Sequence, residues 1–202
     1  MLKIHIIMNN YINKMKFFIF SILLLSITIL SNSQVKYNNI NDFIISYRKP
    51  IVFHKKNEGH YFIDFGKAYF GTIALKLDEN FSDSVIIHIG EKANDYSVDK
   101  NPGGTIRYQK IVLNDLKSNT IIDVKLQPDQ RNTTPPAILL HDSFDVVMPF
   151  RYCEIENLTI SPEKIKIYQK ILHYKFNDSA CYFNTSSEIL NRILELCKHT
   201  VK

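Results

Sequence analysis

Cysteine is scarce in this sequence, which has three in 202 residues, at positions 153, 181 and 197. Because the number is odd and no C-x-x-C pair occurs, the sequence indicates neither a disulfide scaffold nor a zinc site. We expect all three side chains to be buried as small hydrophobic groups.

The motifs of common enzyme classes are also absent. The sequence has no phosphate-binding G-x-x-x-x-G-K-S/T, no dinucleotide-binding G-x-G-x-x-G, no metal-binding H-E-x-x-H and no nucleophile-elbow G-x-S-x-G. The acidic residues are scattered, so the sequence pairs no two of them as general acid and base. His54 and His60 flank a turn and are expected to face solvent, whereas His88 lies inside a strand pattern. The sequence therefore predicts no catalytic residue, cofactor or metal ligand in this chain.

A strong excess of one charge sign is missing as well. The formal net charge is +5, but residues 1–33 carry three lysines and no acid, which leaves +2 on the rest of the chain. No block of lysine and arginine is long enough to follow a phosphate backbone. We therefore expect no nucleic-acid partner.

The first 33 residues have the pattern of a secretory signal peptide. Two lysines precede the apolar run Phe17–Leu30, and small polar residues follow it. The run has about 14 residues, whereas a membrane-spanning helix needs roughly 20. We predict cleavage near Ser33–Gln34, export to the periplasm or the cell exterior, and no stable membrane anchor after cleavage. An uncleaved anchor is the alternative, and Met15 is a possible start of translation.

Seven segments from residue 60 onward alternate apolar and polar residues, which is the period of strands with one buried face. They are His60–Phe65, Gly71–Leu77, Ser84–Ile89, Thr105–Leu113, Thr120–Leu126, Val147–Glu156 and Ile165–Phe176. Turn-forming residues separate them. This predicts mainly β structure, an antiparallel β-sandwich of the jelly-roll or galactose-binding-like kind, over residues 60–160. Residues 34–59 show little pattern and are expected to be a lead-in, and 161–184 a linker strand.

A helix is predicted over residues 185–202. The sequence from Thr185 to Glu188 has the spacing of a capping box. Apolar residues follow at helical spacing, namely Ile189, Leu190, Ile193, Leu196, Cys197 and Val201. No glycine or proline stop signal follows, so we expect the first helix of a truncated helical domain. A terminal helix that docks back on the sandwich is the alternative.

Two polar loops, 91–104 and 127–136, carry the groups that hydrogen-bond sugar hydroxyls. Both contain carboxylates, amides and an arginine in or beside them, and the rings of nearby tyrosines could stack on a sugar face. Our candidate residues for sugar binding or domain docking are Asp99, Asn101, Arg107, Tyr108, Arg131 and Asn132. The alternative is that these loops are simply solvated.

Five segments carry a family resemblance: IDFGKAYFGTIALKL (Ile63–Leu77), VIIHIGEK (Val85–Lys92), DKNPGGTIRY (Asp99–Tyr108), PDQRNTTPPA (Pro128–Ala137) and MPFRYCEIEN (Met148–Asn157). Together they resemble the region ahead of the catalytic domain in bacterial α-L-rhamnosidases of glycoside hydrolase family 78. The tail Phe183–Lys202 looks like the linker strand and first helix that lead into that domain.

The resemblance implies a catalytic (α/α)6 barrel beyond this sequence, in which two carboxylates act by inversion. No catalytic residue is carried over, because none of the barrel's motifs occurs here. The resemblance implies that the chain is the non-catalytic β-sandwich part of an exported α-L-rhamnosidase-like glycoside hydrolase acting on rhamnose-containing glycans. Its partner would be the glycan or the missing barrel. A free-standing exported carbohydrate-binding module and a purely structural domain are the alternatives.

Overall fold

The fold is known from a computed structural model that describes residues 39–137, 139–180 and 182–201. The described residues divide into two compact units, one formed by 39–128 with 142–201 and the other by 129–141. The predicted signal peptide lies outside the described residues. Within them, no helix combines the length and apolar character needed to cross a membrane.

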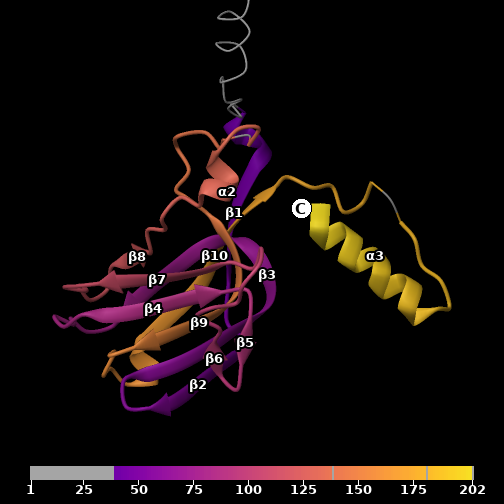
Figure 1. The fold of residues 1–202 in the computed structure, drawn as a ribbon. Coiled ribbons are helices and arrows are strands. Elements are labelled where there is room, and N and C mark those ends of the chain that lie inside the picture. The colour runs from indigo at the N-terminus through magenta and orange to yellow at the C-terminus, as the bar shows by residue number, and fades with distance from the viewer. Residues whose placement is uncertain (1–38, 138, 181, 202) are drawn as a thin grey trace, which may run out of the picture. The chain divides into compact units, whose positions relative to one another are not determined.

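The larger unit consists of antiparallel strands and a terminal helix (Figure 1). Its strands are β1 (Phe43–Arg48), β2 (Val52–Asn57), β3 (His60–Leu77), β4 (Val85–Gly90), β5 (Ala93–Asn94), β6 (Ser97–Val98), β7 (Tyr108–Leu113), β8 (Ile121–Asp123), β9 (Met148–Glu156) and β10 (Ile165–Tyr174). Two 3-10 turns, η1 (Ile40–Asp42) and η2 (Pro162–Lys164), precede β1 and β10, and the helix is α3 (Glu188–Val201).

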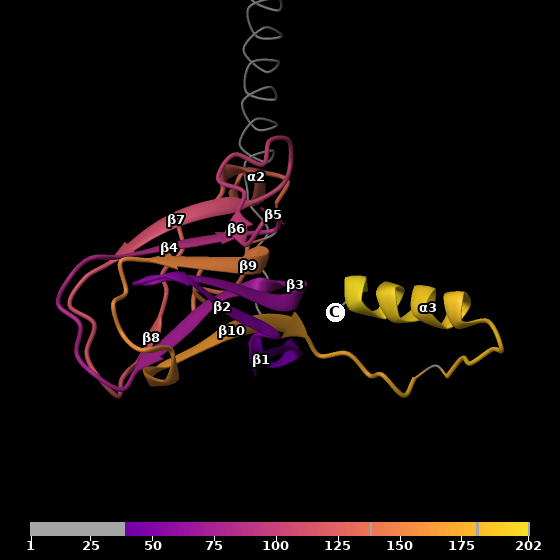
Figure 2. The ribbon, with the colours of Figure 1, turned by 90° about the horizontal axis from the view of Figure 1, so that it is seen from below.

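One curved sheet has the strand order β1-β10-β3-β9-β4-β7, and Figure 2 shows the strands succeeding one another in this order. The long strand β3 belongs to both halves of the sheet. Its first part pairs with β2 and β9, and its last part pairs with β10 and β8. The register shifts between Asp64 and Tyr69, where Gly66 has a φ of +83°. Such irregularities let a strand pass from one layer to the next.

A single apolar core lies between the two layers. Alternate residues of β3, β4, β9 and β10 point into it, as the period of two requires. The core includes Tyr61, Phe65, Ile73, Leu75, Val85, Ile87, Ile89, Phe150, Ile155 and Ile167. The antiparallel β-sandwich predicted from the alternation, followed by one helix, is confirmed.

The sheet extends beyond residues 60–160. The expected lead-in supplies β1 and β2, and the expected linker supplies β10, which pairs with both β1 and β3. The two segments expected at 60–65 and 71–77 form the single strand β3. β1 has no clean alternation because both of its faces are partly exposed, which explains why the sequence pattern missed it.

The smaller unit, residues 129–141, contains the short helix α2 (Gln130–Thr133). Asp129 is its N-cap and accepts a hydrogen bond from the backbone N–H of Arg131 at 2.8 Å. The Arg131 guanidinium also donates to both carboxylate oxygens of Asp129. The peptide bond between Pro135 and Pro136 is cis.

The terminal helix begins at Glu188, three residues after the predicted start at Thr185, so Thr185 precedes the helix and is not its N-cap. Thr185 Oγ1 accepts a hydrogen bond from the Ser187 backbone N–H at 3.1 Å, and the Asn191 side chain bonds the Thr185 backbone at both its N–H and its carbonyl. Near the other end of α3, His199 Nε2 lies 3.0 Å from the carbonyl oxygen of Ala68, and its ring meets that of Tyr69 edge-on.

The cysteines differ from one another in exposure. Cys153 is fully buried in β9, as expected. Cys197 is exposed, so the expectation of burial was wrong for this residue, because the face of α3 that carries it is not covered. Cys181 lies outside the described residues.

Candidate functional site

Two of the residues predicted to bind sugar, Asp99 and Asn101, stabilise their own loop. The Asp99 carboxylate lies 3.0 Å from Lys92 Nζ and accepts the backbone N–H of Asn101 at 3.0 Å. The Lys92 hydrogen bond is the main cause of the lowered pKa of Asp99. Asn101 itself is exposed.

Arg107 and Tyr108 lie at the start of β7, and both are tied to the sandwich. The Arg107 backbone N–H donates to Glu91 Oε1 at 2.7 Å. The Tyr108 hydroxyl lies 2.8 Å from His88 Nδ1, and the two rings stack with centroids 5.9 Å apart. Burial raises the pKa of Tyr108. Arg131 and Asn132 belong to the other unit, residues 129–141.

The structure instead shows a buried polar cluster around Glu154, which the sequence did not single out. Cys153 and Ile155 point into the core, so strand alternation places Glu154 and Glu156 on the outer face of β9. Glu154 is only 1% exposed, and its sheet neighbours are Phe62 on β3 and His88 on β4. Two acids two residues apart in one strand, Glu154 and Glu156, were the available signal.

The Glu154 carboxylate is fully engaged. It lies 2.5 Å from His60 Nε2 and accepts hydrogen bonds from Lys56 Nζ at 3.1 Å and the Val98 backbone N–H at 2.9 Å. The expectation that His60 faces solvent was wrong, because this contact leaves its side chain only 21% exposed. His54 is exposed, as expected.

Glu156 forms the second half of the cluster. Its Oε1 accepts a hydrogen bond from Lys100 Nζ at 2.6 Å and lies 3.2 Å from His88 Nε2. His88 lies in β4, as its strand pattern predicted, and its side chain is 4% exposed. The cluster therefore combines lysine, histidine and carboxylate side chains from four strands, β2, β3, β9 and β4, and from the loop that carries Lys100.

The hairpin β5–β6 covers this cluster. Its two turn residues, Asp95 and Tyr96, both have positive φ, which is the geometry of a type I′ turn. The Tyr96 ring contacts those of His54 and Phe62, with centroids 4.5 Å and 5.7 Å away. Positive φ is costly for a bulky residue, so these ring contacts and the Val98–Glu154 hydrogen bond together hold the hairpin in place.

The charge states of the cluster follow from these contacts. Burial raises the pKa of Glu154, but the hydrogen bonds from Val98, His60 and Lys56 outweigh it and the pKa is lowered overall. The pKa of Glu156 is lowered in the same way, with Lys100 opposing the effect of burial. Burial lowers the pKa of His88, and the nearby Lys100 charge lowers it further. At neutral pH both carboxylates are ionised and His88 is neutral.

Within the part of the chain that the structure describes, His60, Glu154 and Glu156 form a group whose donor atoms could be considered for a metal ion. Their ligand atoms lie within 4.8 Å of one another. However, Lys56 and Lys100 already neutralise the two carboxylates at hydrogen-bonding distance. A divalent cation would have to displace both lysines, so the donor set fits an ion-pair cluster better than a metal centre.

Comparisons with known proteins give two structural similarities. No family model and no curated protein matches the chain. The structure of α-L-rhamnosidase from Dictyoglumus thermophilum is similar over 74% of this chain, with 22% identity and a TM-score of 0.47. A rhamnosidase from Klebsiella oxytoca with rhamnose bound is similar over 76% of this chain, with 16% identity and a TM-score of 0.40. The chain covers 15% and 34% of those two chains.

Proposed function

We propose that this chain is the exported, non-catalytic β-sandwich part of an α-L-rhamnosidase-like glycoside hydrolase, and that it supports a helical catalytic domain acting on rhamnose-containing glycans. The observation that carries the proposal is the apolar face of α3, which the sandwich leaves exposed. The substrate class rests on the sequence segments that resemble this family, and export rests on the signal-peptide pattern of residues 1–33.

The apolar face of α3 consists of Ile189, Leu190, Ile193 and Leu196. Their side chains are between 48% and 72% exposed. Burying one such side chain is worth roughly 1.5–3 kcal/mol, so the helix has a strong drive to find a partner surface. An amphipathic helix buries its stripe well between the ridges of other helices. A helical catalytic domain supplies that surface.

The cluster around Glu154 supports the non-catalytic part of the proposal. An inverting glycosidase needs one carboxylic acid with a raised pKa to protonate the leaving group. Glu154 and Glu156 have lowered pKa values and are bound to lysines. Neither can act as that acid at neutral pH.

The first test is a hydrolysis assay. The purified chain is expected to give no turnover of an aryl α-L-rhamnoside above the rate of buffer alone. Turnover that disappears in Glu154→Gln or Glu156→Gln, while a Glu79→Gln control retains it, would overturn the non-catalytic assignment.

The second test concerns the helix. We expect the chain to bind an isolated (α/α)6 catalytic domain of an α-L-rhamnosidase, and the double variant Ile189→Asp, Leu196→Asp to bind at least about tenfold more weakly. Lys110→Gln, on the outer edge strand β7, is the control. Binding by calorimetry that is insensitive to the two α3 substitutions would contradict the proposed role of this face.

A further inference from the structure

The outward face of β1, β10 and β3 carries a hollow of about 310 Å3 that has no part in the Glu154 cluster. Its lining includes Tyr47, Ala74, Lys76, Ile121, Lys166 and Tyr168. The hollow lies at the small end of the range of roughly 300–1,000 Å3 found for small-molecule sites. It is open to solvent and is lined mostly by apolar and aromatic side chains with two lysines.

Strand register explains why these side chains lie together. Lys76 is directly opposite Lys166, and Ala74 is directly opposite Tyr168, in the β3–β10 pair. Leu75 and Ile167, between them, point into the core. Ala74 forms the floor of the hollow, because its small side chain leaves room between larger neighbours.

Two tyrosines form one wall. Tyr47 on β1 and Tyr168 on β10 meet edge to face, with ring centroids 6.4 Å apart and an angle of 88° between the rings. Tyr47 is 53% exposed. Neither hydroxyl has a hydrogen-bond partner among the described residues. An exposed, supported ring of this kind offers an apolar face and a polar edge, the combination that suits a sugar ring.

The opposite wall carries an uncompensated positive charge. Like charges directly opposite each other in an antiparallel pair are destabilising. Lys166 Nζ is compensated by both carboxylate oxygens of Asp78, each at 2.9 Å. Lys76 has no carboxylate partner among the described residues. The surplus charge of the hollow therefore belongs to Lys76, and a bound anion would relieve the repulsion.

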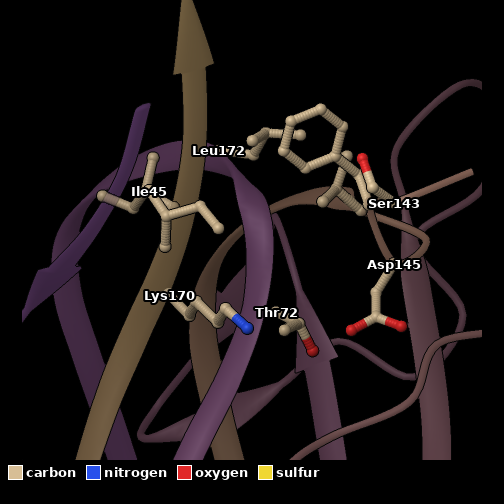
Figure 3. Close-up of a pocket in the computed structure, with 9 residues that line it drawn as sticks. Ile45, Thr72, Ser143, Asp145, Lys170 and Leu172 are labelled. Carbon is tan, nitrogen blue, oxygen red and sulfur yellow. The ribbon is translucent and has the colours of Figure 1, made fainter. Parts of the chain in front are cut away.

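A second, smaller hollow of about 60 Å3 lies further along the same face and includes Ile45, Thr72, Asp145 and Lys170 in its lining (Figure 3). Figure 3 shows Lys170 and Asp145 on opposite sides of it. Lys170 is paired with Asp123 at 2.5 Å, and Asp145 with Lys125 at 2.6 Å. This hollow is charge-balanced and has room for about two water molecules, so it suits hydroxyl groups and not a second carboxylate.

We propose that this face binds an acidic saccharide, with one sugar ring against Tyr47 and the carboxylate of that ring on Lys76. The charge-balanced hollow beside Lys170 then receives neutral hydroxyl groups. The proposal rests on the hollow itself and stands whether or not the chain supports a catalytic domain.

The test is calorimetric titration of the full chain with trigalacturonate at low ionic strength, with maltotriose as the neutral probe of similar size. We expect trigalacturonate to bind and maltotriose to bind at least about tenfold more weakly. An exposed ion pair contributes little, so Lys76→Gln should weaken binding about three- to fivefold. Tyr47→Ala should weaken it about tenfold through loss of the ring.

Two controls make the result specific. Lys110→Gln removes the same charge from β7, away from the hollow, and should leave the affinity unchanged. Tyr47→Phe keeps the ring and should retain most of the affinity. If Lys76→Gln and Lys110→Gln weaken trigalacturonate binding equally, the effect comes from net charge alone and the proposed site is wrong. Equal binding of the two trisaccharides would overturn the preference for an acidic ligand, and no binding of trigalacturonate would overturn the proposal as a whole.

Discussion

At the scale of single residues, the outer face of β9 is stabilised by ion pairs that are largely shielded from solvent. Glu154 is 2% exposed at its side chain and Lys56 is 23% exposed. Removing one partner of such a pair leaves a poorly solvated charge behind, which costs more than the pair contributes. Surface pairs such as Lys164–Glu79, with side chains 46% and 41% exposed, lack this property.

We predict that Glu154→Gln lowers the free energy of unfolding by about 3 kcal/mol. This is the low end of the range for a broken buried ion pair, because the Lys56 side chain remains partly in contact with solvent. The matched variant Glu79→Gln should lose less than about 1 kcal/mol. Urea unfolding of the two variants checks this. Similar losses would mean that the Glu154 cluster is no more stabilising than a surface pair.

The same cluster and the separate ion pair between Asp64 and Arg151 predict a loss of stability in acid. The pKa values of Asp64, Glu154 and Glu156 are lowered in the folded chain, for Asp64 chiefly by its hydrogen bond to Arg151. Their contribution is fully present above the ordinary carboxyl pKa and is lost as the pH falls through the folded value. The pKa of His88 is also lowered, so the unfolded chain takes up a proton first and stability begins to fall below about pH 6.5.

We therefore expect the melting temperature to decline gently between pH 7 and pH 5 and steeply below pH 4.5. His88→Gln should remove the gentle decline in melting temperature between pH 7 and pH 5 and leave the steep decline below pH 4.5 unchanged. A wild-type melting temperature that is flat from pH 7 to pH 4 would contradict these protonation states.

The sequence correctly placed His88 in a strand, whereas the expected exposure of His60 was wrong. Alternation in Ser84–Ile89 is local, so it places His88 within a strand from short-range information alone. The burial of His60 depends on Glu154, which lies 94 positions further along the chain. Asp99, Asn101 and Tyr108 were singled out for their chemistry. In the structure Asp99 contacts Lys92 and Asn101 within its own loop, and Tyr108 contacts His88 of β4.

At the scale of elements, β3 is the piece on which both layers depend. The sequence predicted its two halves, because each alternates cleanly, but not their continuity across Gly66–Phe70. That continuity is a property of the partners, since β9 follows β3 through the register shift. Strands β1 and β2 were missed for a related reason: their positions are determined by pairing with β10 and β3 and not by a buried face of their own.

At Gly71 the backbones of β3 and β10 are so close that there is no room for a side chain. A Cβ atom at this position would lie 2.1 Å from the Lys170 carbonyl oxygen, which is backbone and cannot turn aside. We predict that Gly71→Ala costs at least about 3 kcal/mol of unfolding free energy, at or above the upper end for overpacking. Gly103→Ala, where no atom lies within 4 Å and φ is +69°, should cost only about 1–2 kcal/mol. Equal costs, measured by urea unfolding, would argue against the close approach.

At the scale of the whole molecule, the helix and the sandwich differ in how completely they bury their apolar surface. The sandwich encloses one continuous core, whereas α3 keeps four large apolar side chains at least 48% exposed. Exposed patches of this kind promote association. The sequence predicted both the helix and its stripe, because helical periodicity is local, but it left open whether the stripe docks back on the sheet.

Deletion of residues 186–202 should therefore improve solubility and leave the cooperative thermal unfolding of the sandwich intact. The expected change in melting temperature is small, because the described contacts of α3 with the sheet centre on His199. Light scattering and calorimetry measure the two effects. Loss of cooperative unfolding in the deletion variant would show that α3 belongs to the sandwich core.

Because Cys153 is buried, the rate at which its thiol is alkylated can report how often the sheet opens. Its side chain is fully enclosed in β9, and burial strongly raises the pKa of its thiol, so the reactive thiolate is suppressed twice over. In a variant that retains only this cysteine, with serine at positions 181 and 197, alkylation must wait for the strand to separate from β3 or β4. The rate of labelling then reports how often the centre of the sandwich opens under native conditions.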